Sequence, residues 1–229
     1  MRGLLAALLI SALASPVVES LNCVQCNSFT KPCANVSASE CPLEEAHSCV
    51  SSWSNSLLGG TLSLYEDMSC SAANCSGDPD AFLSFTVRVS DTEHFDFASQ
   101  CCQGKTCNTT DSTSDSPQED LSDTQCLACY GWNTTSCTGK PWKCYKGERC
   151  VYLIAQFKNA TETLVLKGCS NIGTSTCELL SARNETFEGL ALQKIECTDA
   201  TPIALPSPGS RTFPGPLALT SLLLLGLLL

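Results

Sequence analysis

The longest apolar runs of the sequence lie at its two ends, and shorter runs that alternate with polar residues lie between them. Residues 3–13 follow a single charged residue, Arg2, and residues 217–229 are almost wholly apolar. A helix needs about 20 apolar residues to span a membrane, so both runs are short for a span. The pattern predicts a targeting signal at each end and a separate folded body between them.

The first run predicts a secretory signal peptide over residues 1–20. Small residues follow it, with Val18 and Ser20 at the minus-three and minus-one positions of a cleavage site. Cleavage after Ala14 is the weaker alternative. Secretion would place the mature chain in an oxidising compartment, where disulfides persist.

The C-terminal run, residues 217–229, predicts the removable tail of a glycosylphosphatidylinositol (GPI) signal, behind a stalk and attachment region at residues 198–216. The candidate attachment residues are Ser207, Gly209 and Ser210. Ser207 has the better spacing but precedes a proline, whereas the other two leave a short spacer. A transmembrane helix is the alternative, although the run would rise only about 20 Å against a hydrocarbon core of about 30 Å.

Alternation within the body predicts β-strands. In the first half, Phe85, Val87 and Val89 alternate with polar residues, and Phe95 and Phe97 do the same. In the second half, residues 151–157 and 163–167 predict a hairpin with residue 159 at its tip, and residues 186–195 predict a further strand. We expect no helix outside the two ends, so the predicted fold class is small, disulfide-rich and all-β.

The 18 cysteines fall into a set of ten, from Cys23 to Cys107, and a set of eight, from Cys126 to Cys197. Both sets open with Cys-x-x-Cys, and a third cysteine follows seven or eight residues later. An even count in each set predicts a disulfide framework repeated in tandem, although spacing alone leaves the pairing open. Domains this small need such bridges, which each contribute about 2–4 kcal/mol.

The two sets define the domain organisation. The first domain is predicted over residues 21–108 and the second over residues 126–197. Residues 109–125 are rich in Ser and Thr and contain five acidic residues but no Lys or Arg. This composition predicts a solvated, extended linker.

The chain offers little chemistry for catalysis or metal binding. Its two histidines, His47 and His94, have no partner at ligand spacing, and His94 beside Glu93 predicts an exposed strand-edge residue. Zinc or redox roles for the Cys-x-x-Cys pairs are less favoured than structural disulfides in a secreted protein. A net charge of −10 argues against nucleic acid as a partner. We therefore expect no enzyme, no metal and no cofactor.

The cysteine motifs resemble those of the three-finger LU domains of the lymphocyte-antigen/urokinase-receptor superfamily. The first set opens with LNCVQC at residues 21–26 and closes with CCQGKTCN at residues 101–108. The resemblance covers nearly the whole mature chain and implies two tandem three-finger domains. The second domain departs from it, because it ends at Cys197 without the paired cysteines and the Cys-Asn ending.

The resemblance also implies a disulfide pairing. In the first domain it pairs Cys23–Cys49, Cys26–Cys33, Cys41–Cys70, Cys75–Cys101 and Cys102–Cys107. In the second domain it pairs Cys126–Cys150, Cys129–Cys137, Cys144–Cys169 and Cys177–Cys197.

Six Asn-x-Ser/Thr sequons predict N-linked glycans. Three of them fall in predicted finger loops of the second domain, and Asn35 lies similarly in the first. Asn74 precedes a disulfide cysteine that would hinder a glycan. Asn108 matches the terminal asparagine of the family, which bonds inward, so we do not expect it to be glycosylated. The predicted glycosylation sites are Asn35, Asn74, Asn133, Asn159 and Asn184.

The second finger of the first domain has an apolar tip that is a candidate binding surface. The tip itself is residues 57–60, and the candidate surface consists of Leu57 and Leu58 with Trp53 before the tip and Tyr65 after it. An exposed apolar tip can bind a partner, but packing against the neighbouring domain is an equal alternative. Trp132 and Trp142 in the second domain present the same choice.

A closer resemblance is to a gut-epithelial member of the family with two domains. It rests on SQCCQGK at residues 99–105, GKPWKCY at 139–145 and LVLKGCSN at 164–171. It implies a GPI-anchored protein, apical or shed, that binds the bacterial surface or flagella and limits access of bacteria to the epithelium. Contact with the membrane would be through the lipid alone. The alternative is an adhesion or signalling receptor for a protease, a matrix protein or a receptor on a neighbouring cell.

Overall fold

The computed structural model describes residues 20–29, 33, 35–75, 82–102, 120–157, 161–182, 186–187 and 190–204. Several predictions lie outside these residues: the signal peptide up to residue 19, most of the linker, the three attachment residues and the tail, and also Cys107, Asn108, Asn159 and Asn184. Within the described ranges, no helix is long and apolar enough to cross a membrane.

The first half of the chain forms an antiparallel sheet of long hairpins. Its strands follow the order β2–β5–β4–β7–β6, and β1 pairs with β3 in a small separate sheet. The bounds are β1 (Asn22–Cys23), β2 (Cys26–Ser28), β3 (Ser39–Glu40), β4 (Ser48–Ser56), β5 (Ser63–Ser71), β6 (Phe82–Arg88) and β7 (His94–Cys102). Two short 3₁₀ helices, Leu43–Glu45 and Leu58–Gly60, lie between strands.

The second half repeats this arrangement. β13, β10 and β11 are adjacent, and β11 also pairs with β8, which pairs with β9 and β14. The bounds are β8 (Leu121–Trp132), β9 (Lys140–Tyr145), β10 (Arg149–Phe157), β11 (Thr163–Ser170), β12 (Thr186–Phe187), β13 (Leu190–Thr198) and β14 (Thr201–Pro202). The predicted hairpin at 151–167 is present as β10 and β11. The strand predicted at 186–195 is instead a hairpin of β12 and β13, in which Phe187 pairs with Leu190.

One helix, α1 (Thr174–Ala182), corrects the expectation that the body contains none. Its buried side chains are Cys177 and Leu180, and Cys177 is bridged to Cys197 in β13. The Ser181 hydroxyl donates a hydrogen bond to the carbonyl of Ile195 at 3.2 Å. With only two buried positions, the helix carries too little periodicity to be recognised in the sequence.

The last residues of the predicted linker, 121–125, belong to strand β8 instead. β8 begins at Leu121, which pairs with Tyr145, and Gln125 pairs with both Lys143 and Thr201. Residues 121–125 are therefore part of the sheet, because two neighbouring strands satisfy their backbone groups.

The described bridges are the same pairs that the family resemblance implies. They are Cys23–Cys49, Cys26–Cys33, Cys41–Cys70, Cys75–Cys101, Cys126–Cys150, Cys129–Cys137, Cys144–Cys169 and Cys177–Cys197. Cys102 is also disulfide-bonded, and the partner predicted for it lies outside the described residues.

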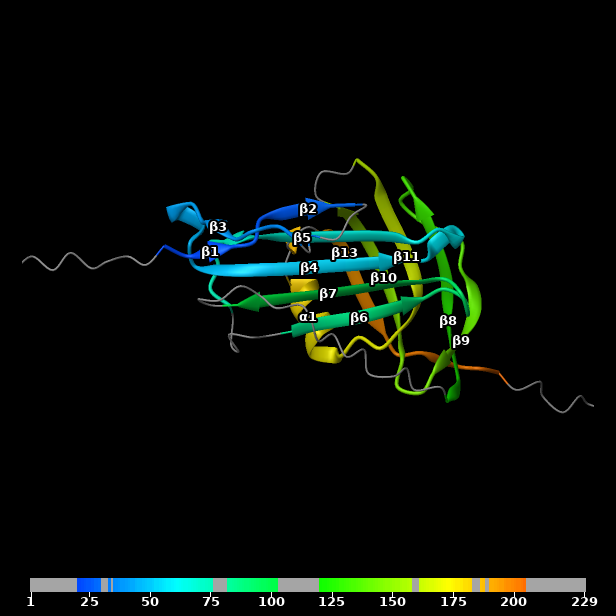
Figure 1. The fold of residues 1–229 in the computed structure, drawn as a ribbon. Helices are drawn as coiled ribbons and strands as arrows, with labels where there is room; N and C mark the ends of the chain where they lie inside the picture. Colours follow the sequence, from blue (N-terminus) through cyan, green and yellow to red (C-terminus); the bar gives the residue numbers. More distant parts are fainter. Residues whose placement is uncertain are drawn as a thin grey trace, which may run out of the picture.

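A short strand pairing joins the two halves into one continuous sheet. At the end of β11, Cys169 pairs with Arg88 and Ser170 pairs with Val87 of β6. The side-chain oxygen of Asn171 accepts a further hydrogen bond from the Thr86 backbone N–H at 2.8 Å. In Figure 1 the strands of the first half cross those of the second half at a large angle. Contact between the halves therefore includes backbone as well as side chains.

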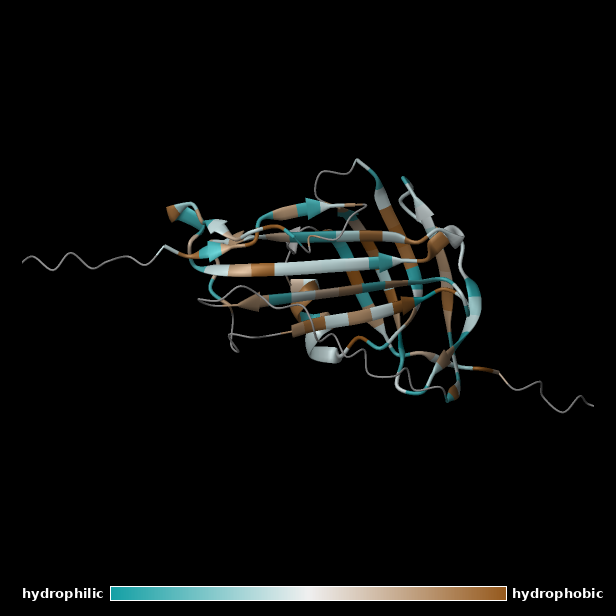
Figure 2. Cartoon of the chain, in the orientation of Figure 1, coloured by the Kyte–Doolittle hydropathy of each residue, from teal (hydrophilic) through white to brown (hydrophobic). Residues whose placement is uncertain are grey.

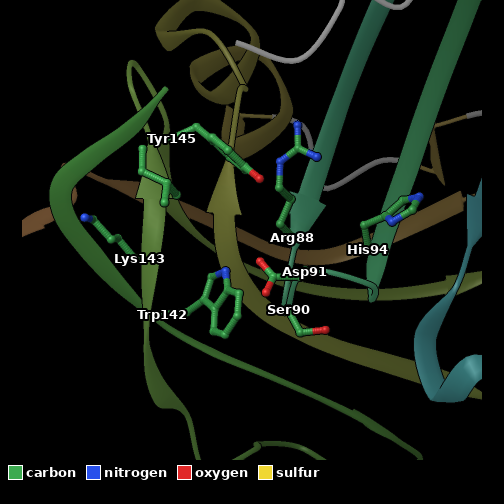
Figure 3. Close-up of a pocket in the computed structure, with 8 residues that line it drawn as sticks. Arg88, Ser90, Asp91, His94, Trp142, Lys143 and Tyr145 are labelled. Atoms are coloured by element: carbon green, nitrogen blue, oxygen red, sulfur yellow. The ribbon is translucent and has the colours of Figure 1, made fainter. Parts of the chain in front are cut away.

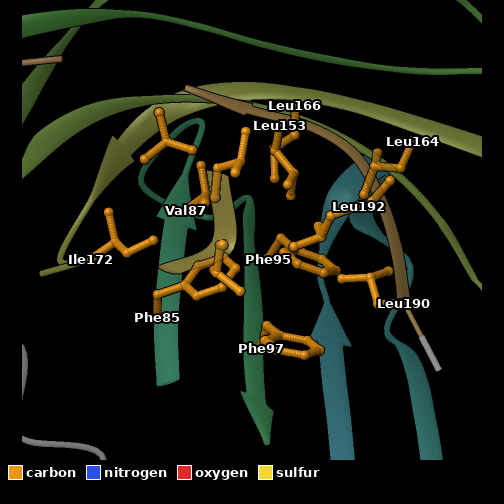
Figure 4. Close-up of a cluster of buried hydrophobic side chains, with 14 of the residues drawn as sticks. Phe85, Val87, Phe95, Phe97, Leu153, Leu164, Leu166, Ile172, Leu190 and Leu192 are labelled. Atoms are coloured by element: carbon orange, nitrogen blue, oxygen red, sulfur yellow. The ribbon is translucent and has the colours of Figure 1, made fainter. Parts of the chain in front are cut away.

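The two halves also share one hydrophobic core. Alternate residues of the strands face inward, as the hydropathy colours of β6 and β10 show in Figure 2. Figure 4 shows Phe85, Phe95 and Phe97 of the first half facing leucines of the second half. The main members from the second half are Leu153, Leu164, Leu166, Leu190 and Leu192. The tandem domains therefore bury their sheets against each other.

Gly168 allows the two halves to come this close. A Cβ at residue 168 would overlap the backbone carbonyl oxygen of Arg88, which leaves no room for any side chain. We predict that Gly168→Ala destabilises the full chain by about 3 kcal/mol, because backbone has to shift. This corresponds to a fall in Tm of about 6–12 °C, measured by circular dichroism with disulfides intact.

Gly173→Ala is the matched control, because a Cβ there meets only the Thr176 hydroxyl at an ordinary 3.8 Å. An unchanged Tm in Gly168→Ala would show that the strands β11 and β6 do not approach as described.

Candidate binding surface

Two of the four residues of the candidate binding surface in the second finger are buried. Leu58 and Tyr65 are 6% and 3% exposed and belong to the shared core, whereas Trp53 and Leu57 are half-buried. The structure therefore favours the packing alternative for Leu58 and Tyr65. These two side chains face the second half of the chain, which covers them.

Tyr65 lies in an aromatic cluster between the halves. Its ring centroid is 4.7 Å from that of Phe29 and 5.0 Å from that of Phe157. The Asn27 side chain donates a hydrogen bond to the Tyr65 hydroxyl at 2.9 Å. Burial, and then the nearby Asp67 carboxylate, raise the pKa of Tyr65 to about 12. Tyr65 therefore stays a neutral phenol at ordinary pH and packs in that form between the two halves.

The Glu93 carboxylate, in the turn between β6 and β7, connects the tip of the second finger to β8. It accepts hydrogen bonds from the Gly59 N–H at 3.0 Å and from the Tyr130 hydroxyl at 3.1 Å. Burial, and then Glu93, raise the pKa of Tyr130. Gly59 has a φ of +75°, a conformation that favours glycine at the finger tip. The second finger is thus tied to β8 of the other half.

A pocket of about 240 Å³ lies where the two halves meet, and we call it the junction pocket. Figure 3 shows the side chains of β9 on one side of it and those of β6, β7 and their connecting turn on the other. The side chains that define it are Arg88, Asp91, His94, Trp142, Lys143 and Tyr145.

Arg88 is held in a fixed position in this pocket. Its Nε lies 2.9 Å from the Glu148 carboxylate, which is 5% exposed and also accepts the Tyr145 backbone N–H at 2.8 Å. The guanidinium stacks over the Tyr145 ring at 5.1 Å. The pocket therefore contains a cation with a buried counter-ion behind it.

His94 is not the exposed strand-edge residue that the sequence predicted. It pairs with Arg88 of β6 on one side, and its carbonyl accepts the Leu57 N–H on the other. Its ring lies 3.3 Å from the Asp96 carboxylate. β7 is an inner strand, because β4 and β6 flank it, and this puts His94 beside the junction pocket.

The two tryptophans have different surroundings. Trp142 lines the junction pocket and packs partly against the core, whereas Trp132 is 39% exposed and is not part of that lining. The sequence pointed to both tryptophans. It gave no signal for Arg88, Asp91 or Tyr145, because their neighbours come from the other half of the chain.

A second groove, of about 270 Å³, lies on the outer face of the second half. Tyr152 lines it, and the ammonium groups of Lys167 and Lys194 each lie 4.6 Å from the centre of its ring. Such cation–π contacts occupy the tyrosine face. Among the described residues, the one aromatic ring that lines this groove is therefore already in contact with two cations.

Three predicted glycosylation sites lie on described, exposed residues: Asn35, Asn74 and Asn133. Asn133 has a φ of +54°, and its side-chain oxygen accepts a hydrogen bond from the Thr163 N–H at 3.1 Å. This bond uses the oxygen and not the nitrogen to which a glycan would be attached. The local geometry of Asn133 is therefore compatible with modification.

Two groups of three cysteine sulfurs in the described ranges are close enough to surround a metal. One contains Cys23, Cys41 and Cys70, and the other contains Cys126, Cys144 and Cys169. Every one of these sulfurs is in a disulfide. A metal ligand must be a free thiolate, and a sulfur in a disulfide is not one. These two groups of sulfurs are therefore structural disulfides and not metal sites.

Paired hairpins that extend from buried disulfides, in two copies, define a tandem three-finger protein. Over its whole length the chain is 47% identical to Ly6/PLAUR domain-containing protein 8 of Bos taurus, all of which is covered. It is 45% identical over 201 residues to the protein of the same name from Mus musculus, covering 88% of this chain and 77% of that one. The chain belongs to the Ly6/PLAUR domain family, whose members are typically non-enzymatic proteins of the cell surface.

Two other comparisons add less. No family model matches the chain. The crystal structure of mouse TEX101 is similar with a TM-score of 0.41 and 17% identity, over 77% of this chain and 97% of that one.

The buried phenol of Tyr65 predicts a loss of stability in alkali. Its pKa of about 12 in the folded chain exceeds the ordinary 10.0, so both states are protonated below pH 10 and the effect is absent there. Above pH 10 the unfolded chain releases the proton more readily, and the free energy of unfolding falls as pH rises towards 12.

Tyr65→Phe removes this titration. At neutral pH the variant should lose about 1 kcal/mol, because the Asn27 amide keeps its bond to Asp67 but loses the one to the Tyr65 hydroxyl. It should then lose less stability than the wild type between pH 10 and pH 12. Denaturant unfolding at several pH values measures both. Equal alkaline losses in the two proteins would contradict the assignment.

Proposed function

We propose that the chain is an N-glycosylated, GPI-anchored protein of the apical epithelial surface that binds flagellated bacteria. Binding would limit the motility of the bacteria and their access to the epithelium. The observation that carries the proposal is the full-length relationship to Ly6/PLAUR domain-containing protein 8 of Bos taurus. The gut-epithelial resemblance of the sequence motifs supports the bacterial partner.

The surface of the chain suits a hydrated coat at a membrane. Asn35, Asn74 and Asn133 are exposed, and the net charge of −10 keeps such a coat soluble. Glycans on anchored molecules can each make weak polar contacts with a bacterial filament. Many such contacts in an array add up through effective concentration.

The burial of Leu58 and Tyr65 also supports a role for glycans. Leu58 and Tyr65 are in the shared core, so these two side chains are not free to bind a protein. Recognition then depends on the outer faces of the molecule and on what is attached to them. The second half carries three sequons, at Asn133, Asn159 and Asn184, and Asn133 lies on that surface.

We predict that cells expressing the full chain capture flagellated bacteria. Phosphatidylinositol-specific phospholipase C should remove the protein and the captured bacteria together, because the proposed tether is lipid. The triple variant Asn133→Gln, Asn159→Gln, Asn184→Gln should capture several-fold fewer bacteria at equal surface density, measured by microscopy and flow cytometry.

The matched control is the double variant Asn35→Gln, Asn74→Gln, which removes sequons from the first half only. It should retain most of the capture. Full capture by the triple variant would refute the glycan role and favour a protein surface. Binding to mammalian cells but not to bacteria would favour the adhesion or signalling receptor instead.

A further inference from the structure

The junction pocket has two different walls. β9 contributes the rings of Trp142 and Tyr145, and the β6–β7 turn contributes the polar groups of Ser90 and Asp91. Figure 3 shows these side chains around one space, with Trp142 next to Asp91 in this view. At about 240 Å³ the pocket is smaller than the roughly 300–1,000 Å³ typical of drug-sized ligands. It therefore suits one compact group.

Both walls are rigid. Trp142 and Tyr145 flank Cys144, which is fully buried and bridged to Cys169 of β11. On the opposite wall, the Ser90 hydroxyl accepts the N–H of Glu93 at 3.0 Å and so holds the turn. A site whose walls are already ordered loses little entropy when a ligand binds.

The charges around the pocket balance. Arg88 is neutralised by Glu148, and the rest of the lining contains one cation, Lys143, and one carboxylate, Asp91. Any charge on His94 is met by Asp96 at 3.3 Å. A charged ligand would therefore gain little net attraction, whereas an uncharged ligand that both donates and accepts hydrogen bonds would find partners for both.

A sugar ring has this chemistry. Its C–H face packs against an aromatic ring, and its hydroxyls donate to a carboxylate and accept from cationic or hydroxyl groups. Trp142 supplies the ring, Asp91 the acceptor and Arg88 the donor. We propose that the junction pocket binds one uncharged sugar unit of a larger saccharide.

This inference rests on the proposed function and deepens it, because saccharides are abundant on bacterial surfaces. It also requires both halves of the chain, since β6 and β9 supply opposite walls. Neither half alone would hold the site.

The test uses the purified full chain and saturation-transfer NMR with methyl glycosides. The probes are the glycosides of glucose, galactose, mannose and N-acetylglucosamine, with N-acetylneuraminic acid and glucuronic acid as acidic comparisons. We expect millimolar binding of at least one neutral probe and weaker binding of the acidic ones. Asp91→Asn, which keeps the turn, and Trp142→Ala should each weaken binding about tenfold.

Trp132→Ala is the matched control, because Trp132 is exposed but lies outside the pocket lining. It should bind as the wild type does. Since Trp142 also packs on the core, Trp142→Phe keeps a ring there and should bind between the wild type and Trp142→Ala. Asp91 is exposed, so Asp91→Asn tests the site without disturbing the core.

Three results would overturn the inference: no neutral probe binds at millimolar concentration, only acidic probes bind, or Asp91→Asn and Trp142→Ala leave binding unchanged. Bacterial capture is measured on the same proteins. A wild type that binds a glycoside but captures no bacteria would refute the proposed function and leave the sugar site standing. Capture without glycoside binding would refute the sugar site alone.

Discussion

The close backbone contact between β11 and β6 at Gly168 is the constraint on which the rest of the structure depends. It lets Cys169 and Ser170 pair with Arg88 and Val87, so that the sheets of the two halves continue into each other. Once they are joined, the inner faces of both sheets pack together and form one core. Two small units, each below the size for a comfortable core, thus gain a larger one.

This arrangement decides which surfaces remain for binding. The finger tip at Leu58 and the ring of Tyr65 are covered by the opposite half, and Glu93 ties the tip to Tyr130. What stays accessible is the outer face with its sequon at Asn133 and the pocket between β9 and the β6–β7 turn. A surface that neither half has alone is created where they meet.

The sequence predicted local features well and the contact between the halves poorly. Alternating Phe85, Val87 and Val89 identified β6, and the family resemblance implied the pairs seen in the described disulfides. The pattern also predicted that Leu58 belongs to an apolar tip and that Tyr65 follows it. It left open what covers that tip, because alternation gives the inward face of a strand and not the surface it meets.

The missed features share this cause. Arg88, Asp91 and Tyr145 become one site only through pairing across the two halves, and α1 is stabilised by its bridge to β13 rather than by its own periodicity. Residues 121–125 were predicted as linker from composition, yet pairing with β9 and β14 makes them a strand. Tertiary contacts decided all of these features.

Differential scanning calorimetry of the oxidised full chain tests the shared core most directly. One core predicts a single cooperative transition, in which the calorimetric enthalpy equals the van't Hoff enthalpy. Two resolved transitions, each with the enthalpy of one half, would contradict it. They would show that the halves fold as independent units and that the junction pocket is not a fixed part of the molecule.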